Sequence, residues 1–385
     1  GSDTTAFMTL VQAAGGQAII TANYGSGTPQ EAADWVRFCN VDHQYNVKYW
    51  EIGQETYQPA ETGSHDPVVY AQQFGAFYAA MKAVDPTIKI GMPGTISSLN
   101  SAPSGQAPGP GQGDTGYEYN GWGPKVLKAL KVTPDFYVVE YYPERAYTGM
   151  LHEDDADLLQ YPKDWATIVP IVRNMLNQGL GPAAAGVEIV ASEFNSSVTP
   201  GKQSVSIVNG LFLADSLGQI VNTEITGDLW WDLHNGYDPT NNNSDFLYGF
   251  REYGDFGLLS SAKNPMAMPN TPYPTYYALQ LWSELAGPGS KLLASVSNEE
   301  LLPIYAAARL DGTVALLVIN KNSERQLGAT INVAGFKASQ MHVEQYGVFE
   351  DYVGTGPTTY DLPVPGSPFV FLFPSYSINV LILKP

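Results

Sequence analysis

The feature that most constrains the fold is the alternation of short apolar runs with helical segments over about the first 288 residues. The apolar runs are predicted strands, at 17–25, 47–55, 88–94, 134–143, 187–195 and 226–235. Segments with helical spacing separate them, such as 67–86, which ends at Pro86. Strands that alternate with helices pair in parallel, and continuous apolar strands are covered on both faces. We therefore expect an α/β domain built around a parallel sheet.

A different pattern begins near residue 289 and continues to the C-terminus. Short strands with alternating apolar residues follow one another, and turn signals such as "LDGT" separate them. The sequence therefore predicts two domains, an α/β domain over 1–288 and an antiparallel β-sandwich over 289–385.

Composition excludes several classes of partner. The net charge is −19, and binding to nucleic acid or to an anionic membrane requires clustered Lys and Arg. No apolar run approaches the roughly 18 residues of a membrane span. The single cysteine, Cys39, allows no intrachain disulfide and no zinc site, and its helical context predicts a small buried hydrophobe. No signal peptide is visible at the start of the chain, but the low charge and acidity are typical of a secreted protein.

Polar residues gather where the predicted strands end. They are Asn23, Glu55, Tyr142, Glu193 and His234. The glycine-rich motifs of nucleotide-binding doubly wound sheets are absent from the sequence. In a (β/α)8 barrel the carboxyl ends of the strands carry the active site. We therefore expect a TIM-type (β/α)8 barrel with its site at that end.

Two of these strand ends carry a glutamate, Glu55 in "EIGQE" and Glu193 in "ASEFN". A carboxyl group beside aromatic walls has a raised pKa, whereas one that accepts hydrogen bonds stays ionised. Two carboxyl groups with separated pKa values form an acid and a nucleophile, the combination that glycosidic bond cleavage requires. The alternative is that one or both glutamates belong to buried ion pairs. The abundant aromatic side chains, 24 Tyr, 15 Phe and 7 Trp, fit either a large core or stacking on sugar rings.

Three segments carry a resemblance to a known family: "KYWEIGQE", "VASEFN" and "ITANYGSGTPQEAADWVRFCN". They resemble retaining glycoside hydrolases with catalytic glutamates on barrel strands four and seven, and most closely the family 51 α-L-arabinofuranosidases. Families 39 and 30 are related. The resemblance implies that Glu55 is the general acid/base and Glu193 the nucleophile, with no metal or organic cofactor. It also implies a β-sandwich after the barrel.

The same resemblance identifies the six predicted strands as barrel strands three to eight. The opening residues 1–16 look like the helix between strands two and three, so the first two strands are missing from the pattern. Six strands do not close an eight-stranded barrel without a gap. Either a segment is absent from this chain, or another chain fills the place, or the barrel is open. An exposed sheet edge also favours association, so a homo-oligomer is a further possibility.

Two positions depart from the family pattern. Gln54 stands where the family usually has the Asn that holds the sugar 2-OH, so the substrate position shifts or the substrate differs. Glu140 stands where related sequences often have His, two residues before Tyr142. A third carboxyl group near the pair raises pKa values by repulsion, unless Glu140 points to an adjacent helix instead. Tyr142 is expected to hydrogen-bond the nucleophile.

Further residues are candidates for binding the carbohydrate. Trp231 is expected to be a sugar platform, with core filling as the alternative. His234 is either a hydrogen-bond donor to substrate or a structural loop residue, and Asn23 is a candidate site residue. The acidic segments 152–157 and 238–245 have calcium-ligand character without the spacing of an EF-hand, and we expect them to be solvated loops rather than metal sites.

These observations predict a secreted retaining glycoside hydrolase that acts on plant or microbial polysaccharide. An α-L-arabinofuranosidase comes first, and an endo-β-glucanase, xylanase or β-xylosidase is the alternative within the same superfamily. The alternative from another class is a carbohydrate-binding protein with a degenerate site. Glu51, in "YWEIGQE", is expected to be buried and to pair with a cation, with an arginine of an early barrel strand as the candidate.

Overall fold

The computed structural model describes residues 3–96, 121–144, 154–240, 243–364 and 366–385. The chain divides into two compact units. The first comprises residues 1–141, 166–194 and 223–229, and the second comprises residues 142–165, 195–222 and 230–385. The domain boundary predicted near residue 288 falls inside the second unit and remains a prediction.

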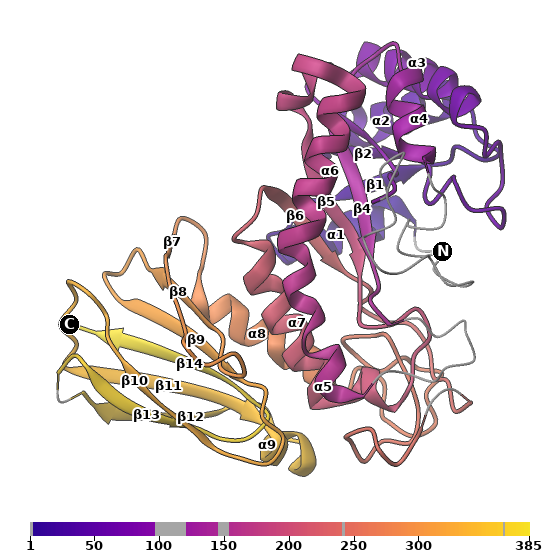
Figure 1. Cartoon of the computed structure of the whole chain (residues 1–385). Helices are drawn as coiled ribbons and strands as arrows, with labels where there is room; N and C mark the ends of the chain where they lie inside the picture. Colours follow the sequence, from indigo (N-terminus) through magenta and orange to yellow (C-terminus); the bar gives the residue numbers. More distant parts are fainter. Residues whose placement is uncertain (1–2, 97–120, 145–153, 241–242, 365) are drawn as a thin grey trace. The chain divides into compact units, whose positions relative to one another are not determined.

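A six-stranded sheet forms the centre of the first unit, with its strands in chain order (Figure 1). The strands are β1 (Ile19–Ala22), β2 (Tyr49–Ile52), β3 (Lys89–Met92), β4 (Phe136–Tyr141), β5 (Glu188–Phe194) and β6 (Ile225–Trp230). The pairs from β1 to β5 are parallel. All six strands predicted from the sequence are present, each shorter than its apolar run. Within the described residues this sheet is the parallel part of the predicted barrel.

Helices precede and follow these strands along the chain. They are α1 (Thr4–Ala13), α2 (Pro29–Val36), α3 (Pro67–Val84), α4 (Trp122–Ala129) and α6 (Trp165–Leu180), with a π-helical turn at Arg37–Asp42 and a 3-10 turn at Gly181–Gly186. The helices α2, α3 and α4 pack together beside the sheet (Figure 1). Local sequence starts them: Thr28 accepts a hydrogen bond from the backbone of Glu31 at the start of α2, and Asp66 caps α3 in the same way.

The inward face of the sheet follows the two-residue alternation of the strands. On β4 it carries Phe136, Val138 and then Glu140, and on β5 Val190 lies in the same apolar cluster as Phe136 and Val138. The ring of Phe136 covers Gly91 of β3, where any β-carbon would lie 2.1 Å from the ring. This apolar layer separates an ion pair between Lys89 and Glu188 at the amino ends of the strands from the carboxyl groups at the other end.

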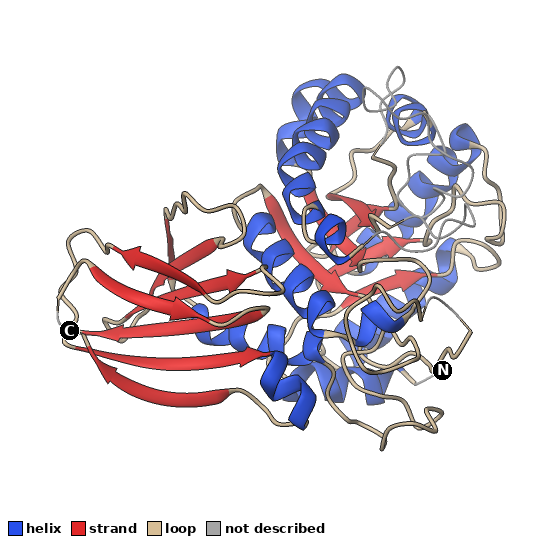
Figure 2. Ribbon diagram, turned by 60° about the horizontal axis from the view of Figure 1, so that its bottom comes forward, coloured by secondary structure: helices blue, strands red, loops and turns tan. Residues whose placement is uncertain are grey.

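The second unit contains two antiparallel sheets, which Figure 2 shows as red arrows. The larger has the order β12-β11-β14-β9-β8-β7 and the smaller pairs β10 with β13. The strands are β7 (Lys291–Leu293), β8 (Ile304–Ala308), β9 (Val314–Asn320), β10 (Leu327–Ile331), β11 (Gln340–Gly347), β12 (Thr358–Pro363), β13 (Phe369–Phe373) and β14 (Ser377–Lys384). The antiparallel C-terminal region is thus present as predicted.

Helical elements complete the second unit. They are α5 (Asp155–Leu158), α7 (Ile207–Ile220), α8 (Pro274–Leu285), α9 (Val348–Val353) and 3-10 turns at Tyr161–Asp164 and Lys202–Val205. The two sheets share one apolar core, to which Leu316 of β9 and Phe371 of β13 contribute. Helices α7 and α8 pack on strands β9 and β14. Strand β9 is consequently buried along its whole length, because its two faces meet the helices and the smaller sheet.

A buried ion pair joins α7 to the end of β9. The Lys321 ammonium binds Asp215, and it also donates to the carbonyl of Leu159 at 2.6 Å. The hydroxyl of Tyr305 donates to the other oxygen of Asp215. Both charged side chains are almost fully buried, so their hydrogen bonds replace the lost hydration.

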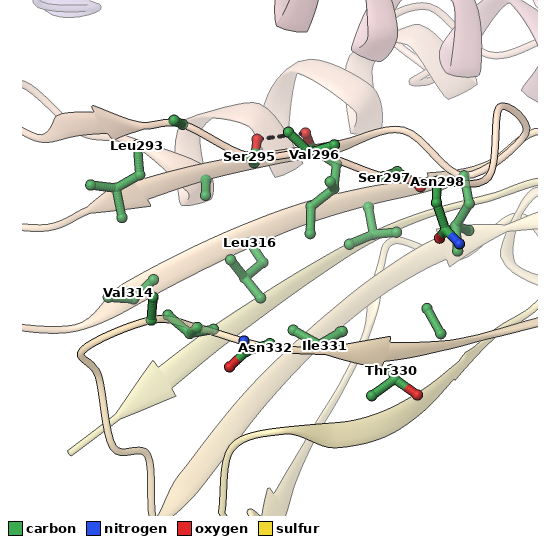
Figure 3. A pocket seen from close by; sticks show the side chains of 18 of the residues that line it. Leu293, Ser295, Val296, Ser297, Asn298, Val314, Leu316, Thr330, Ile331 and Asn332 are labelled. Carbon is green, nitrogen blue, oxygen red and sulfur yellow. Dashed lines mark hydrogen bonds between the residues drawn. The ribbon is translucent and has the colours of Figure 1, made fainter.

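A cavity of about 390 Å³ lies between the sheets of the second unit (Figure 3). Apolar side chains such as Leu316 and Ile331 line it, and Ser295 donates to the carbonyl of Ile304 at its edge. In the described part of the chain its lining includes no charged side chain. The cavity therefore lacks the groups that acid/base chemistry requires.

No helix among the described residues combines the length and the apolar character of a membrane span.

Candidate active site

The turn after β2 positions Glu55. Strand β2 ends at Ile52, whose carbonyl accepts a hydrogen bond of 2.8 Å from Tyr70 of α3. The backbone then leaves the extended region, with φ of +76° at Gly53 and +42° at Glu55. A β-carbon at Gly53 would lie 2.5 Å from the Thr56 side chain, so only glycine fits there. The predicted strand over 47–55 was too long, because this turn, and not the strand, carries Glu55.

A non-glycine residue with positive φ is uncommon and is found disproportionately at functional sites. The conformation of Glu55 is supported by its neighbours. The backbone of Gln58 donates to the carbonyl of Glu55 at 2.8 Å, and the Gln58 side chain donates to the Glu55 carboxyl group. The turn therefore fixes both the backbone and the side chain of Glu55.

A β-bulge positions Glu193. Val139 of β4 pairs with Ala191 of β5, and the next residue, Glu140, pairs with Glu193, so that Ser192 is the extra residue. Without the bulge, Ser192 would lie opposite Glu140. The irregularity therefore brings two glutamates from neighbouring strands side by side, a placement that apolar periodicity does not predict.

Gln54 and Tyr57 link the carboxyl groups. The Gln54 amide donates to Glu140 and, over 3.2 Å, to Oε2 of Glu193. The Tyr57 hydroxyl lies 3.2 Å from Oε2 of Glu140 and 3.4 Å from Oε1 of Glu55. Two residues that follow β2 thus contact carboxyl groups of β4 and β5. Sequence reasoning missed Tyr57 and Gln58, although both stand within three residues of Glu55 in "ETYQ".

These contacts require a curved sheet. In a flat sheet three strand spacings would separate β2 from β5, about 14 Å at about 4.8 Å each. That is more than the side chains of Gln54 and Glu193 span together, yet their polar atoms lie 3.2 Å apart. The carboxyl ends of the strands therefore converge, as they do in a barrel.

Glu51 is fully buried without a cationic partner among the described residues. Its Oε2 lies 3.5 Å from the Thr21 hydroxyl, and its Oε1 has no hydrogen-bond partner in the described part of the chain. Burial first, and then repulsion by Glu193 and Glu55, raise its pKa to about 8. Glu51 is consequently a neutral carboxylic acid at neutral pH. The expected pairing with an arginine of an early barrel strand remains a prediction, because the described residues include no strand before β1.

Glu140 belongs to the same cluster. Burial, followed by repulsion from Glu55 and Glu193, raises its pKa well above the usual range for a glutamate. Its side chain meets Gln54 and Tyr57, so the alternative that it points to a helix does not hold. The structure thus brings together four of the residues singled out from the sequence: Gln54, Glu55, Glu140 and Glu193.

The other candidate residues have local contacts of their own. The Asn23 side chain accepts from the Ser26 backbone at 3.1 Å and so closes a turn after β1. His234 shares a hydrogen bond of 2.7 Å with Asn270, within the second unit. Trp231 is 41% exposed. Tyr142 is buried in the second unit. The roles of these four side chains in substrate binding remain predictions.

Of the two acidic loops, residues 152–153 and 241–242 lie outside the described residues. Asp155 accepts from the Gln203 side chain and from the Tyr248 backbone, both at 2.8 Å, which is a structural role. Over the residues that the structure describes, no group of three His, Cys, Asp or Glu side chains is arranged to hold a metal ion.

The sequence was compared with curated proteins and family models. No family model matches the chain. A protein named "Probable alpha-L-arabinofuranosidase C" from Aspergillus clavatus is 30% identical over 112 residues, which is 24% of this chain and 22% of that protein. "Alpha-L-arabinofuranosidase C" from Emericella nidulans is 28% identical over 102 residues, 23% of this chain and 20% of that protein. The matched region thus spans about a fifth of these relatives.

Solved structures match nearly the whole chain. An α-L-arabinofuranosidase from Thermotoga maritima, in complex with arabinose, has a TM-score of 0.73 and 20% identity, over 99% of this chain and 78% of that one. A family 44 xyloglucanase from Paenibacillus polymyxa has a TM-score of 0.68 and 13% identity, over 99% of this chain and 83% of that one. A GH51 α-L-arabinofuranosidase from Thermotoga petrophila has a TM-score of 0.70 and 20% identity, over 99% of this chain and 78% of that one. The chain therefore has the fold of solved α-L-arabinofuranosidases, and about a quarter of it is similar in sequence to curated α-L-arabinofuranosidases.

Proposed function

We propose that this chain carries the active site of a retaining glycoside hydrolase, with α-L-arabinofuranosides as its first substrate class. The observation that carries the proposal is the linked set of carboxyl groups. Gln54 connects Glu193 to Glu140, and Tyr57 connects Glu140 to Glu55. The names of the fungal relatives and of the Thermotoga structures support the choice of sugar.

The proposed mechanism is double displacement. A carboxylate oxygen of Glu193 attacks the anomeric carbon while the bond to the leaving oxygen breaks, and Glu55 gives its proton to that oxygen. Glu55, now ionised, then takes a proton from water, which displaces Glu193 and restores both side chains. The support in this chain is that a strained turn holds Glu55 and a bulge turns Glu193 toward Gln54.

A second candidate within the same class is an enzyme that cleaves β-glucan, xylan or xyloglucan. Two observations favour it. The family 44 xyloglucanase has a TM-score close to those of the arabinofuranosidases. The Gln54 amide, at the position where the family's Asn holds the sugar, already donates to two carboxyl groups. A degenerate carbohydrate-binding protein is the candidate from another class.

We extend the proposal to the substrate contacts and setting of the protein. The exposed ring of Trp231 suits stacking on a sugar face. Tyr142, Asn23 and His234 are proposed to bind sugar hydroxyls. The acidic, weakly charged composition supports secretion. Strand β1 is the edge of the described sheet, which supports association with a second copy or a partner chain that continues the barrel.

The test is a hydrolysis screen over aryl α-L-arabinofuranosides, arabinan, xylan, β-glucan and xyloglucan. The wild type is compared with Glu193→Gln and with the control Glu188→Gln. The control changes the same residue type five positions earlier on the same strand, about 16 Å away at about 3.3 Å per residue. We expect Glu193→Gln to lose at least about 10³-fold in kcat and the control to retain activity. Equal activity of wild type and Glu193→Gln, or none on any substrate, would overturn the proposal.

A further inference from the structure

Glu140 lies between the two carboxyl groups to which the proposed mechanism assigns the chemistry. One of its oxygens accepts from Gln54, which also donates to Glu193. The other accepts from Tyr57 at 3.2 Å. The Tyr57 hydroxyl thus lies between the carboxyl groups of Glu140 and Glu55, at 3.2 and 3.4 Å, and hydrogen bonding with Glu55 contributes to the raised pKa of Glu140. A hydrogen bond between two carboxyl groups needs a proton on one of them, because two carboxylates offer only acceptors.

In the part of the chain that the structure describes, the groups that act most strongly on Glu140 disfavour a negative charge on it. Among the described residues, the titratable groups that face it are Glu51 from β2, Glu55 and Tyr57 from the turn after β2, and Glu193 from β5. Every charge that these groups can carry is negative. Glu140 itself is buried, so solvent screens these repulsions poorly. The cluster therefore favours the state in which some of its carboxyl groups keep a proton.

We propose, on the basis of the function proposed above, that Glu140 is a positioning residue that shares one proton with Glu55. The proton donor of the reaction is then a carboxyl pair rather than a single glutamate. The pair loses its first proton readily. Loss of the second proton is disfavoured, because it would leave two adjacent carboxylates that repel each other. Burial, the first cause of the raised pKa of Glu140, also favours the state in which the pair keeps its proton.

The proton balance of the reaction is kept. In the first step the pair, carrying one proton on Glu55, transfers it to the leaving oxygen as Glu193 bonds to the anomeric carbon. The Gln54 amide and the Tyr57 hydroxyl then donate to the newly charged carboxylates. In the second step the pair takes one proton back from the attacking water. Glu140 thus contacts Glu55 and not the substrate, and it acts by holding Glu55 in its protonated form.

The inference also accounts for the two departures from the family pattern. Glu140 and Gln54 replace the His and Asn of the resembling sequences, and the two side chains bind each other here. Tyr57 can donate to only one carboxyl group at a time, so it follows whichever member of the pair is ionised. In this arrangement the catalytic proton is shared by the carboxyl groups of Glu55 and Glu140 and is not held by a single acid.

The test compares the pH profile of kcat/KM for wild type, Glu140→Gln and the control Glu188→Gln. Replacing Glu140 by the isosteric amide removes the repulsion, so the limb at high pH moves to lower pH by about one unit or more. At pH values above this decline, kcat/KM of Glu140→Gln is at least about tenfold below that of the wild type. The control Glu188→Gln shows the same decline at high pH as the wild type. A uniform loss of activity with an unmoved limb would mean that Glu140 is only structural and would overturn the proposal.

A second measurement does not need activity. Protein labelled with carboxyl-¹³C glutamate is titrated by NMR, and the wild type alone tests the idea. Two carboxyl carbons that titrate together in two coupled steps are expected, and in Glu140→Gln a single step at lower pH replaces them. Independent titration of every carboxyl group in the wild type would overturn the proposal. If no substrate is cleaved but the coupled steps appear, the proposed function fails and the shared proton stands.

Discussion

The buried Glu51 makes the stability of the first unit depend on pH in an unusual direction. In the unfolded chain its carboxyl group releases its proton near pH 4.5, whereas in the fold it keeps it to about pH 8. Over this window the folded state binds more protons than the unfolded state, so the free energy of unfolding falls as pH rises. The contribution is fully present below pH 4.5 and is lost once the pH passes about 8.

The size of the stability change follows from the shift in the pKa of Glu51. From 4.5 to about 8 is 3.5 pH units. At about 1.4 kcal/mol per unit, wild type loses on the order of 5 kcal/mol that Glu51→Gln does not lose. The variant keeps the shape of the side chain and has no proton to release. We therefore expect it to become the more stable protein as the pH rises through this window.

The assay is urea unfolding followed by tryptophan fluorescence at several pH values. The control is Glu61→Gln, which alters an exposed glutamate of the same unit and should change stability by less than about 0.5 kcal/mol at every pH. A stability difference between Glu51→Gln and wild type that stays constant from about pH 4.5 to about pH 8 would refute the reasoning. It would mean that a cation or water compensates the buried charge.

Three further predictions concern the turn, the buried ion pair and the sheet edge. Gly53→Ala should lower the free energy of unfolding by about 1–3 kcal/mol and kcat at least about tenfold, because φ at this position is +76° and the Thr56 side chain blocks a β-carbon. The control Gly75→Ala, in a helix with open space around it, should leave stability unchanged or raise it. Lys321→Met should lower the free energy of unfolding, measured by heat or urea, by about 3–5 kcal/mol, because it leaves Asp215 charged and buried. Adding Asp215→Asn should recover much of this loss, and additive losses from the two substitutions would contradict the coupling. Light scattering should show an oligomer if the edge of β1 associates, and a monodisperse monomer would refute it.

The sequence predicted the order and type of the elements because periodicity and caps are local. Strand, helix and strand alternate in the first unit as expected, and Thr28 and Pro29 mark the start of α2. The predicted strands were too long, since the apolar runs continue into turns. At Glu55 the reason is specific: Gly53 bends the chain two residues before the predicted end of the strand at residue 55.

Part of the candidate site could be named from the sequence. Glu55, Glu193 and the unusual Gln54 and Glu140 could be named from motifs, because the resemblance concerns short segments. Their contacts could not be named, because they depend on a bulge at Ser192 and on the curvature of the sheet. The protonated state of Glu51 was also missed, because charge balance in a cluster is set by residues that come together only in the fold.

The central claim, that Glu193 is the nucleophile and Glu55 the acid/base, is tested most directly by trapping the covalent intermediate. Glu55→Gln is incubated with an aryl α-L-arabinofuranoside whose leaving group needs no protonation, and the protein is digested for mass spectrometry. Because this variant lacks the base for the second step, the sugar ester should accumulate. We predict one added pentosyl group on the peptide that contains Glu193. An adduct on another residue, or turnover without any adduct and without change in rate, would contradict the account.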